Sequence, residues 1–311
     1  MSATVRVAVV GVGALGQHHA RLFASMEGVE LVGVVDTNLS RAADIGGRYG
    51  APAFTDARDL PAALDAVTVA VPTVSHVEVA LPLLERGIAV LVEKPLAPAV
   101  ADAERLVEAA ERRGVVLGAG HTERFNPAVE AALPLVTNPR FIEVHRLGAF
   151  PERSLDIDVV FDLMIHDLDL LLAAVRSEVV AVEAVGVNVL TPRTDIANAR
   201  VRFASGCIAN VTASRISRDR VRKARFFQAE SYVSVDFALQ EVEVYRLTPG
   251  DGRPVIEGGK VHVVRDEPLR RELADFVAAV REQRPPGVSG RAGCRALALA
   301  ERVAAAMAGT T

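Results

Sequence analysis

The sequence has few of the features that mark secreted or membrane-bound proteins. Cys207 and Cys294 are its only cysteines, and they form no Cys-x-x-Cys pair. A disulfide framework or a cysteine-bound zinc ion is therefore not expected. No apolar run is long enough to cross a membrane, and the longest, residues 168–175, is interrupted by Asp169. The chain also starts without a basic leader or a cleavage site. These absences predict a cytoplasmic protein with no membrane partner.

An excess of charge of one sign is missing as well. The sequence holds 35 lysines and arginines against 39 aspartates and glutamates, which gives a net charge of −4. Such a chain has no bulk attraction for nucleic acid or for an anionic surface, so no nucleic-acid partner is expected. Half of the residues are hydrophobic and 24% are charged, which is typical of a globular protein. Its 311 residues are enough for two domains.

The first 120 residues alternate short β-branched runs with segments of helical period. We expect strands at residues 5–10, 31–36, 66–71, 89–93 and 115–118. We expect helices at residues 15–25, 39–49, 76–86 and 98–113. Strands that are apolar on both faces and alternate with helices are typical of a parallel sheet covered on both sides. Residues 1–120 are therefore predicted to form an α/β dinucleotide-binding Rossmann domain with a doubly wound parallel sheet.

From residue 121 the pattern changes to one strongly apolar helix, at residues 159–175, among many strands. The strands are expected at residues 141–150, 179–190, 197–203, 207–214, 224–228, 232–237 and 241–247. A surface loop is expected at residues 249–259, and closing helices at 268–283 and 289–307. This pattern predicts an α+β domain with a large, mostly antiparallel open sheet over residues 121–311. We expect this domain to bind substrate, and its closing helices could pack back on the first domain. An open sheet face needs a cover, which predicts a homodimer or homotetramer through that sheet.

A glycine-rich motif follows the first expected strand and opens a helix. It contains Gly11, Gly13, Ala14, Leu15 and Gly16. In a dinucleotide site the first glycine permits the tight turn, the second lets the backbone approach a pyrophosphate, and the third allows close helix–strand packing. The phosphates then lie at a helix N-terminus, where N–H groups and the helix dipole favour negative charge. The alternative is a glycine-rich turn without a ligand, but the strand before it and the helix after it favour cofactor binding.

Asp36 ends the second expected strand, 20 residues after Gly16. A carboxylate at this position accepts hydrogen bonds from the adenosine ribose and repels a 2′-phosphate, so NAD is expected rather than NADP. Arg41 leaves the alternative open, because its guanidinium could approach a 2′-phosphate.

Glu93-Lys94-Pro95 falls just after another apolar strand. Ligands of open α/β sheets bind beyond the carboxyl ends of the strands, so the Lys94 ammonium is a candidate for the cleft. Pro95 restricts the backbone of Lys94 and disfavours helix there. An ordinary solvated lysine at a strand end is the alternative.

A second group of polar residues lies on the apolar helix of the second domain. Asp162, His166 and Asp169 are spaced i, i+4 and i+7, which places them on one face of an α-helix. Charges on so apolar a helix are costly unless they are paired or face a polar cleft. A carboxylate one turn before a histidine can orient it as a general base. The alternative is a buried structural pair. Metal binding is not expected, because no second histidine lies at ligand spacing.

Together these motifs resemble the Gfo/Idh/MocA family, which includes glucose–fructose oxidoreductases, inositol dehydrogenases and rhizopine-catabolism proteins. The matching motifs are Gly11-x-Gly13-x-x-Gly16, Glu93-Lys94-Pro95, Arg124-Phe125-x-Pro127 and Asp162-x-x-x-His166. They occur in the family's order and cover essentially the whole chain. The resemblance implies an NAD(P)-dependent oxidoreductase that acts on a CH–OH group of a sugar or cyclitol.

The resemblance also implies roles for individual residues. Lys94 would lie between nicotinamide and substrate, His166 would take the hydroxyl proton, and Asp162 would orient His166 and bind a substrate hydroxyl. The segment with Pro72, Thr73 and His76 is similar to the family's loop along the cofactor, and Glu93 belongs to the same cofactor site.

One segment departs from the common family pattern. Where many members have Asn-x-Arg-Phe, this chain has His121 near the expected substrate side, with Arg124 three residues later. Residues 121–127, 145–148 and 195–200 are most similar to family members associated with lipid A synthesis. Those members resemble 3-dehydrogenases of UDP-N-acetylglucosamine, which implies oxidation at C3 of a UDP-N-acetylhexosamine. Inositol or a free aldose is the alternative substrate.

A run of basic residues, from Arg215 to Arg225, bears on that choice. Arginine binds phosphate through paired hydrogen bonds, so Arg215 and its neighbours are candidates for a UDP pyrophosphate. The alternative is a solvated hairpin or a subunit contact, as for most charge runs. A different class of function, an NAD-binding regulator without turnover, would be expected to lose Lys94 or His166, and this chain has both.

Overall fold

A computed structural model describes residues 4–150, 157–250 and 253–308. It divides into two compact units, each described below by itself. The first unit is Met1–Thr122 with Glu267–Cys294, and the second is Glu123–Asp266 with Arg295–Thr311. Within the described ranges, no helix is both long and apolar enough to cross a membrane.

The first unit contains a six-stranded sheet in which every neighbouring pair is parallel. Its strands are β1 (Val5–Val10), β2 (Val29–Val35), β3 (Ala53–Phe54), β4 (Ala66–Val69), β5 (Ala89–Glu93) and β6 (Leu117–Gly120). The order β3-β2-β1-β4-β5-β6 is that of a doubly wound dinucleotide domain, which confirms the predicted fold. Strand β3 was not predicted, because two residues are too few to show an alternating pattern.

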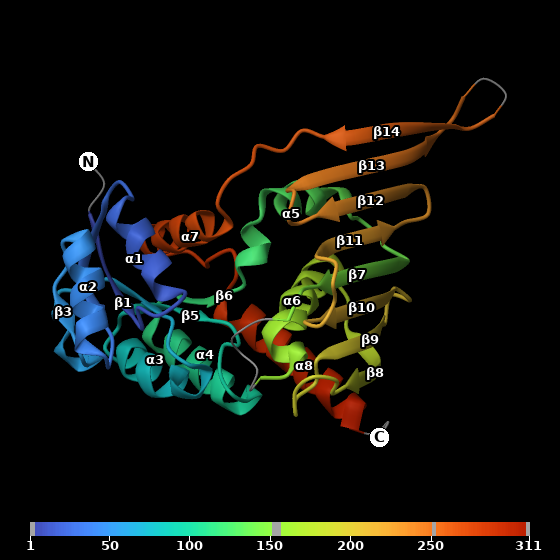
Figure 1. Ribbon diagram of the computed structural model, residues 1–311. Helices are drawn as coiled ribbons and strands as arrows, with labels where there is room; N and C mark the ends of the chain where they lie inside the picture. Colours follow the sequence, from blue (N-terminus) through green and yellow to red (C-terminus); the bar gives the residue numbers. More distant parts are fainter. Residues whose placement is uncertain (1–3, 151–156, 251–252, 309–311) are drawn as a thin grey trace. The chain divides into compact units, whose positions relative to one another are not determined.

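Helices lie on both faces of this sheet. They are α1 (Gly16–Ala24), α2 (Leu39–Tyr49), α3 (His76–Glu85), α4 (Val100–Arg113) and α7 (Pro268–Glu282). Helices α1 and α7 lie on one face and α3 and α4 on the other (Figure 1). Alternate residues of β1, such as Val7 and Val9, join one core cluster with Phe23 of α1 and Phe276 of α7. The layers leave the carboxyl ends of the strands, where Gly11 and Lys94 follow β1 and β5, at one edge.

The second unit is built on an eight-stranded sheet. Its strands are β7 (Phe141–Leu147), β8 (Val179–Val187), β9 (Ile196–Phe203), β10 (Ile208–Ser214), β11 (Val221–Phe227), β12 (Ser231–Asp236), β13 (Glu241–Thr248) and β14 (Val255–Val261). They are ordered β14-β13-β12-β11-β7-β10-β9-β8. Strands β7 and β10 are parallel and the other neighbours are antiparallel, which confirms the predicted mostly antiparallel sheet.

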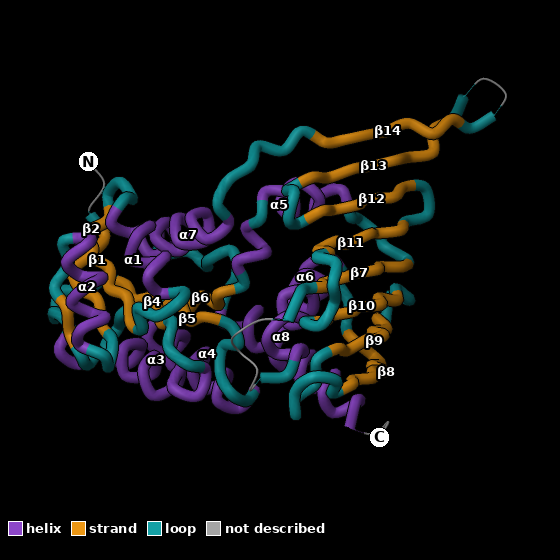
Figure 2. Tube along the Cα trace, in the orientation of Figure 1, coloured by secondary structure: helices purple, strands orange, loops and turns teal. Residues whose placement is uncertain are grey.

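One face of this sheet is covered by helices (Figure 2). They are α5 (Pro127–Ala132), α6 (Ile165–Ala174) and the C-terminal part of α8 (Gly290–Ala308). Ile142 and Val144 of β7 share a core cluster with Leu168 and Leu171 of α6 and Leu299 of α8. The sequence predicted a single covering helix, whereas the structure adds α5 and the second half of α8.

The predicted surface loop at residues 249–259 is wrong from residue 255 onward. Strand β14 starts at Val255 and pairs antiparallel with β13; residues 251–252 lie outside the described ranges. A Cβ at Gly258 would lie 2.0 Å from the Val244 carbonyl oxygen, so the glycine permits the close approach of the two strands. Glycines usually indicate a loop, but here Gly258 and Gly259 are part of an edge strand.

Candidate cofactor and catalytic site

The turn between β1 and α1 is built on its glycines. Gly11 has a positive φ of 86°, and a Cβ there would lie 2.7 Å from the Ala70 carbonyl group. A Cβ at Gly16 would lie 1.7 Å from the Gly11 carbonyl oxygen, so no other residue fits. At Gly13, by contrast, a Cβ would meet only Nη1 of Arg41, at 4.0 Å. Gly13 is therefore not required by packing within the protein, and its backbone is open to a ligand.

Helix α1 begins at Gly16 with no side chain capping its N-terminus. Ala14 and Leu15, immediately before it, are exposed. An open helix N-terminus beside a glycine-rich turn favours an anion such as a pyrophosphate, so this arrangement fits a dinucleotide.

Asp36 lies directly after β2 and is held in place by the turn. Its carboxylate accepts hydrogen bonds from the backbone N–H of Val12, at 3.2 Å, and of Asn38, at 2.9 Å. Nη1 of Arg41 lies 3.2 Å from Oδ2 of Asp36, and half of the Arg41 side chain is exposed. The carboxylate thus contacts the backbone of Val12, within the glycine-rich turn, where a ribose hydroxyl would be recognised. The guanidinium of Arg41 is paired with the same carboxylate.

His76 joins two loops at the carboxyl edge of the sheet. Its Nδ1 lies 2.9 Å from the Pro95 carbonyl oxygen and its Nε2 lies 3.0 Å from that of Val71. Burial lowers the pKa of His76, so the ring is neutral at pH 7 and donates to one carbonyl at a time. The other two residues predicted in this cofactor loop are Pro72, which is exposed, and Thr73, which is half-buried.

Glu93 lies at the end of β5 and is 7% exposed. Its Oε1 lies 3.1 Å from Nε2 of the buried His19, and its Oε2 accepts the backbone N–H of Lys94 at 3.2 Å. Burial acts to raise the pKa of Glu93, but the hydrogen bond and charge of His19 and the charge of Lys94 outweigh it and lower the pKa. A charged carboxylate is therefore fixed behind Lys94. Lys94 itself is half-buried, and the bond from Lys94 to Pro95 is cis.

The helix that carries Asp162 and His166 is not one continuous α-helix. Residues Val160–Met164 form a π-helix, and α6 begins at Ile165. A π-turn contains more residues than an α-turn, so the expected single α-helix over residues 159–175 is wrong at its start. Asp162 and His166 are half-buried, whereas Asp169 is 1% exposed. π-turns of this kind occur frequently at functional sites.

Two arginines of the second unit anchor α6. Nε and Nη2 of Arg146, on β7, donate to the two carboxylate oxygens of Asp167 at 2.9 and 2.7 Å. Burial acts to lower the pKa of Arg146, but Asp167 and Glu123 raise it above its ordinary value, so the guanidinium remains charged. Arg124, expected to bind substrate, lies 3.4 Å from Oδ2 of Asp169 and is 21% exposed. These pairs fix α6 at the residues next to His166.

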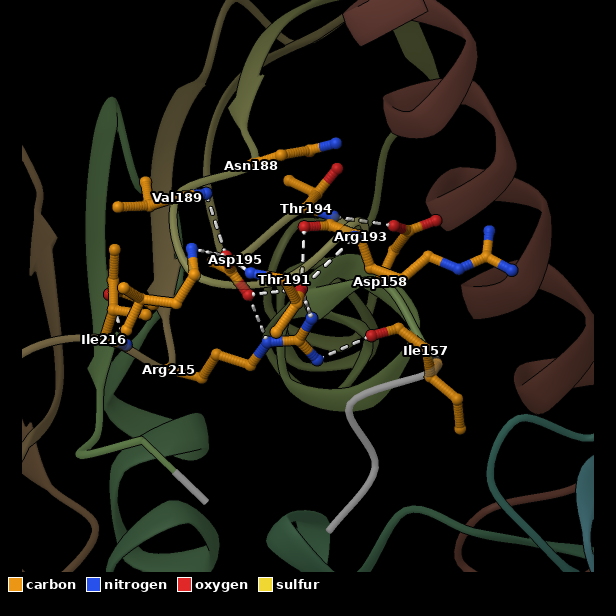
Figure 3. A network of polar contacts seen from close by, with 12 residues as sticks. Ile157, Asp158, Asn188, Val189, Thr191, Arg193, Thr194, Asp195, Arg215 and Ile216 are labelled. Atoms are coloured by element: carbon orange, nitrogen blue, oxygen red, sulfur yellow. Dashed lines mark hydrogen bonds and ion pairs between the residues drawn. The ribbon is translucent and has the colours of Figure 1, made fainter. Parts of the chain in front are cut away.

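The remaining predicted site residues are His121, in the first unit, and Arg215. His121 is 1% exposed and follows β6. Arg215 is 2% exposed and forms an ion pair with Asp195 at 2.8 Å, so it is not part of a solvated run (Figure 3). Arg218, Arg220 and Arg222, later in the basic segment, are exposed.

Two family models match this chain, at residues 5–121 and 139–230. An oxidoreductase family with an NAD-binding Rossmann fold (GFO_IDH_MocA) matches residues 5–121, and a GFO/IDH/MocA C-terminal domain matches residues 139–230. A curated relative, the UDP-N-acetylglucosamine 3-dehydrogenase of Acidithiobacillus ferrooxidans, is 38% identical over 306 residues, which are 97% of each chain. The chain belongs to the Gfo/Idh/MocA family. It is an oxidoreductase with NAD as cofactor, as the sequence predicted.

Solved structures agree with this family fold. A structure of the Acidithiobacillus ferrooxidans enzyme matches with a TM-score of 0.92 and 38% identity over 98% of this chain and 97% of that one. Levoglucosan dehydrogenase in complex with NADH matches with a TM-score of 0.88 over 99% and 98% of the chains, at 18% identity, and so supports the fold alone. An inositol 2-dehydrogenase of Saccharopolyspora erythraea is 34% identical over 58% of this chain and 57% of its own.

Some residues of this family member were not recognised in the sequence as site-forming. His19, Arg146 and Asp167 were not predicted to be site residues, whereas His19 contacts Glu93 and Arg146 pairs with Asp167. Their partners lie 74 and 21 residues away, beyond the reach of a local pattern. The described residues contain no group of three or more histidine, cysteine, aspartate or glutamate side chains that could hold a metal ion. Cys207 is buried, and burial raises the pKa of its thiol to about 11.

Proposed function

We propose that this protein is an NAD-dependent dehydrogenase of a sugar carbinol, and specifically of C3 of a UDP-N-acetylhexosamine. The observation that carries the proposal is the end-to-end similarity to a UDP-N-acetylglucosamine 3-dehydrogenase, with 38% identity over 97% of both chains. A relative that shares both domains at this identity shares the substrate-binding unit as well as the cofactor-binding one. The cytoplasmic location expected from the sequence is part of this proposal.

The proposed chemistry gives each candidate residue one role. NAD, when bound, accepts the hydride from the carbinol carbon. His166 takes the hydroxyl proton as a general base, and Asp162 orients its ring. Lys94 stabilises the developing alkoxide, where a fixed positive charge is most effective. The Glu93 carboxylate supports this arrangement, because it binds the backbone N–H of Lys94 from behind.

For the diphosphate of a nucleotide sugar, we propose Arg222 rather than Arg215. Arg222 on β11 is the register partner of Arg146 on β7, and cross-strand partners share a face of the sheet. Arg146 contacts Asp167 on α6, so Arg222 lies on the helix-covered face. Arg222 is exposed there, which leaves its guanidinium accessible to an anion. His121 and Arg124 remain proposed substrate contacts.

Inositol or a free aldose is the second candidate substrate. The partial match to an inositol 2-dehydrogenase supports it, but that similarity covers only 58% of this chain. A non-catalytic NAD-binding regulator is less consistent with the retention of both Lys94 and His166.

We also propose that the protein forms a homo-oligomer through the open face of the second sheet. Phe141, Phe227, Tyr232 and Tyr245 alternate with core residues of four neighbouring strands and so point to the face opposite the helices. Successive rings of this row have centroids 5.6, 5.1 and 6.3 Å apart. A row of aromatic side chains on an uncovered face is typical of a subunit interface.

The proposal is tested with UDP-N-acetylglucosamine, UDP-glucose, free N-acetylglucosamine and myo-inositol, each with NAD and with NADP, by following the absorbance of reduced nicotinamide. We expect turnover with UDP-N-acetylglucosamine and NAD. Lys94→Ala and His166→Ala should each abolish it while NAD binding, measured by calorimetry, persists. Near-normal rates in either variant would exclude the proposed roles, and preference for a free sugar would exclude the nucleotide-sugar assignment.

A further inference from the structure

Arg215 and Asp195 lie at the centre of a buried polar network in the second unit (Figure 3). Nε of Arg215 donates to Oδ1 of Asp195 at 2.8 Å, and the two side chains are 2% and 0% exposed. Nη2 of Arg215 donates to Oγ1 of Thr191 at 3.0 Å, and this hydroxyl lies 2.8 Å from Oδ1 of Asp195. The three side chains therefore form a closed triangle. A buried ion pair is favourable only when its geometry and hydrogen bonds are this complete.

The Asp195 carboxylate also organises the loop between β8 and β9. Its Oδ2 accepts the backbone N–H groups of Val189, Leu190 and Thr191, at 2.9, 2.6 and 2.9 Å. Burial acts to raise the pKa of Asp195, but these N–H groups and Arg215 outweigh it and hold the pKa well below its ordinary value. Asp195 is therefore a permanent anion at neutral pH.

The network reaches the segment from which the Asp162–His166 helix starts. Nη1 of Arg215 donates to the Ile157 carbonyl oxygen at 2.6 Å. The loop next to Asp195 holds the following residue, because the Thr194 N–H donates to Oδ1 of Asp158 at 2.9 Å. Val159 N–H in turn donates to the Thr194 carbonyl oxygen at 3.0 Å. Three consecutive residues before the π-helix are thus held by this network, Ile157 by Arg215 and Asp158 and Val159 by Thr194.

Residues 157–159 lead directly into the first turn of the π-helix. The Asp158 carbonyl oxygen accepts the N–H groups of Phe161 and Asp162, each at 3.1 Å. Asp158 therefore holds the start of the π-helix and the backbone of Asp162. His166 follows four residues after Asp162, in the first turn of α6. His166 is close in sequence to residues 157–159, so we expect a shift of these residues to displace His166.

We infer that Arg215, with Asp195 and Thr191, is a positioning device for Asp162 and His166, and not a ligand of the substrate. This inference rests on the proposed function for the identity of the base. Displacement of a catalytic group by about 1 Å costs up to roughly a hundredfold in rate. Loss of the Arg215 contacts should therefore reduce kcat while leaving cofactor binding, in the other unit, unchanged.

The test uses Arg215→Lys, because lysine keeps the charge next to Asp195 but cannot donate to Asp195, Thr191 and Ile157 at once. Thr191→Val is a milder second variant that removes only the bridging hydroxyl. The matched controls are Arg225→Lys, which changes the ion pair with Glu143 on the open face of the same sheet, and Thr212→Val, which removes a hydroxyl bonded to Asn198. Melting temperatures establish that all four variants are folded at the assay temperature.

The first readout needs no substrate. The seven histidines are isotopically labelled, and the His166 signal is assigned by its loss in His166→Asn. In NMR titrations of the full chain, Arg215→Lys and Thr191→Val should move the limiting shifts or the titration midpoint of His166. The signals of His19 and His76 should stay in place, and the controls should change none of the three. A His166 signal that is the same in wild type and Arg215→Lys would overturn the inference.

The second readout is turnover of UDP-N-acetylglucosamine with NAD. We expect kcat of Arg215→Lys to fall roughly tenfold or more while KM for NAD changes by less than about twofold. Full turnover by His166→Ala would refute the proposed base, whereas an unchanged His166 signal would refute the positioning role, so the two failures are distinguishable.

Discussion

Nε2 of His19 lies 3.1 Å from Oε1 of Glu93, and this buried pair joins helix α1 to the end of strand β5. His19 is one turn after Gly16, and Glu93 immediately precedes Lys94. The glycine-rich turn and the proposed catalytic lysine are therefore fixed to each other through two side chains that both lie inside the first unit.

Replacing His19 with phenylalanine tests this link. An aromatic ring is kept, but Glu93 loses its donor, which should lower the free energy of unfolding by about 1–3 kcal/mol at pH 7. The folded-state pKa of Glu93 lies below its ordinary value, so its stabilising contribution is present above the unfolded pKa of about 4.3 and is lost as the pH falls through the folded value. The deficit of the variant should therefore persist down to about pH 4.3 and shrink only below it, as the pH falls through the folded value. Urea denaturation at pH 7 and at about pH 3 measures it, with the exposed neighbour His18→Phe as control. Equal deficits at the two pH values would show that the carboxylate charge is not involved.

Gly13 and Gly16 should differ in how an alanine substitution affects stability. Gly16→Ala places a Cβ 1.7 Å from the Gly11 carbonyl oxygen, so the variant should be severely destabilised or fail to fold. Gly13→Ala places its Cβ 4.0 Å from the nearest atom, so the melting temperature should not change. Because the Gly13 backbone faces the proposed pyrophosphate, NAD affinity of the second variant should fall about tenfold or more. Calorimetric titration with NAD measures this, and unchanged affinity would place the cofactor elsewhere.

The pairing of Arg41 with Asp36 predicts how the cofactor preference can be changed. Asp36→Asn keeps the side-chain shape but removes the charge that repels a 2′-phosphate and holds Arg41. We expect the ratio of kcat/KM for NAD to that for NADP to fall about tenfold or more. The double variant Asp36→Asn with Arg41→Ala should lose most of the gain with NADP, since the released guanidinium is gone. If the double and single variants behave alike, Arg41 has no part in the preference.

Arg222 and Arg225 lie on the same strand but on opposite faces, which makes them a matched pair. Arg222→Gln should raise KM for UDP-N-acetylglucosamine by about tenfold, because a charged contact to phosphate is lost. It should leave KM for a slowly used free sugar unchanged. Arg225, which is paired with Glu143, serves as control, and Arg225→Gln should change neither value. Equal effects of Arg222→Gln on both substrates would contradict the phosphate contact.

Most of the fold was predictable because the pattern of apolar residues within each element depends on which of its faces are buried. Val5–Val10 is apolar on both faces since helices cover both sides of β1, and Phe141–Leu147 alternates since only one face of β7 is covered by helices. The failures have local causes too. Strand β3 is too short for a pattern, the glycines of β14 resemble a loop, and nothing in Val160–Met164 indicates a π-turn.

The sequence by itself determined the two fold classes, the dinucleotide turn and the family, because these depend on residues close together in the chain or on motifs in fixed order. Only the tertiary structure decided which charges are paired. His19 finds Glu93 across 74 residues, and Arg215, in a run of basic residues, is buried against Asp195 instead of facing solvent. The physical reason is that the local sequence around a charged residue does not identify its partner. Burial and pairing arise only when distant strands and loops are brought together.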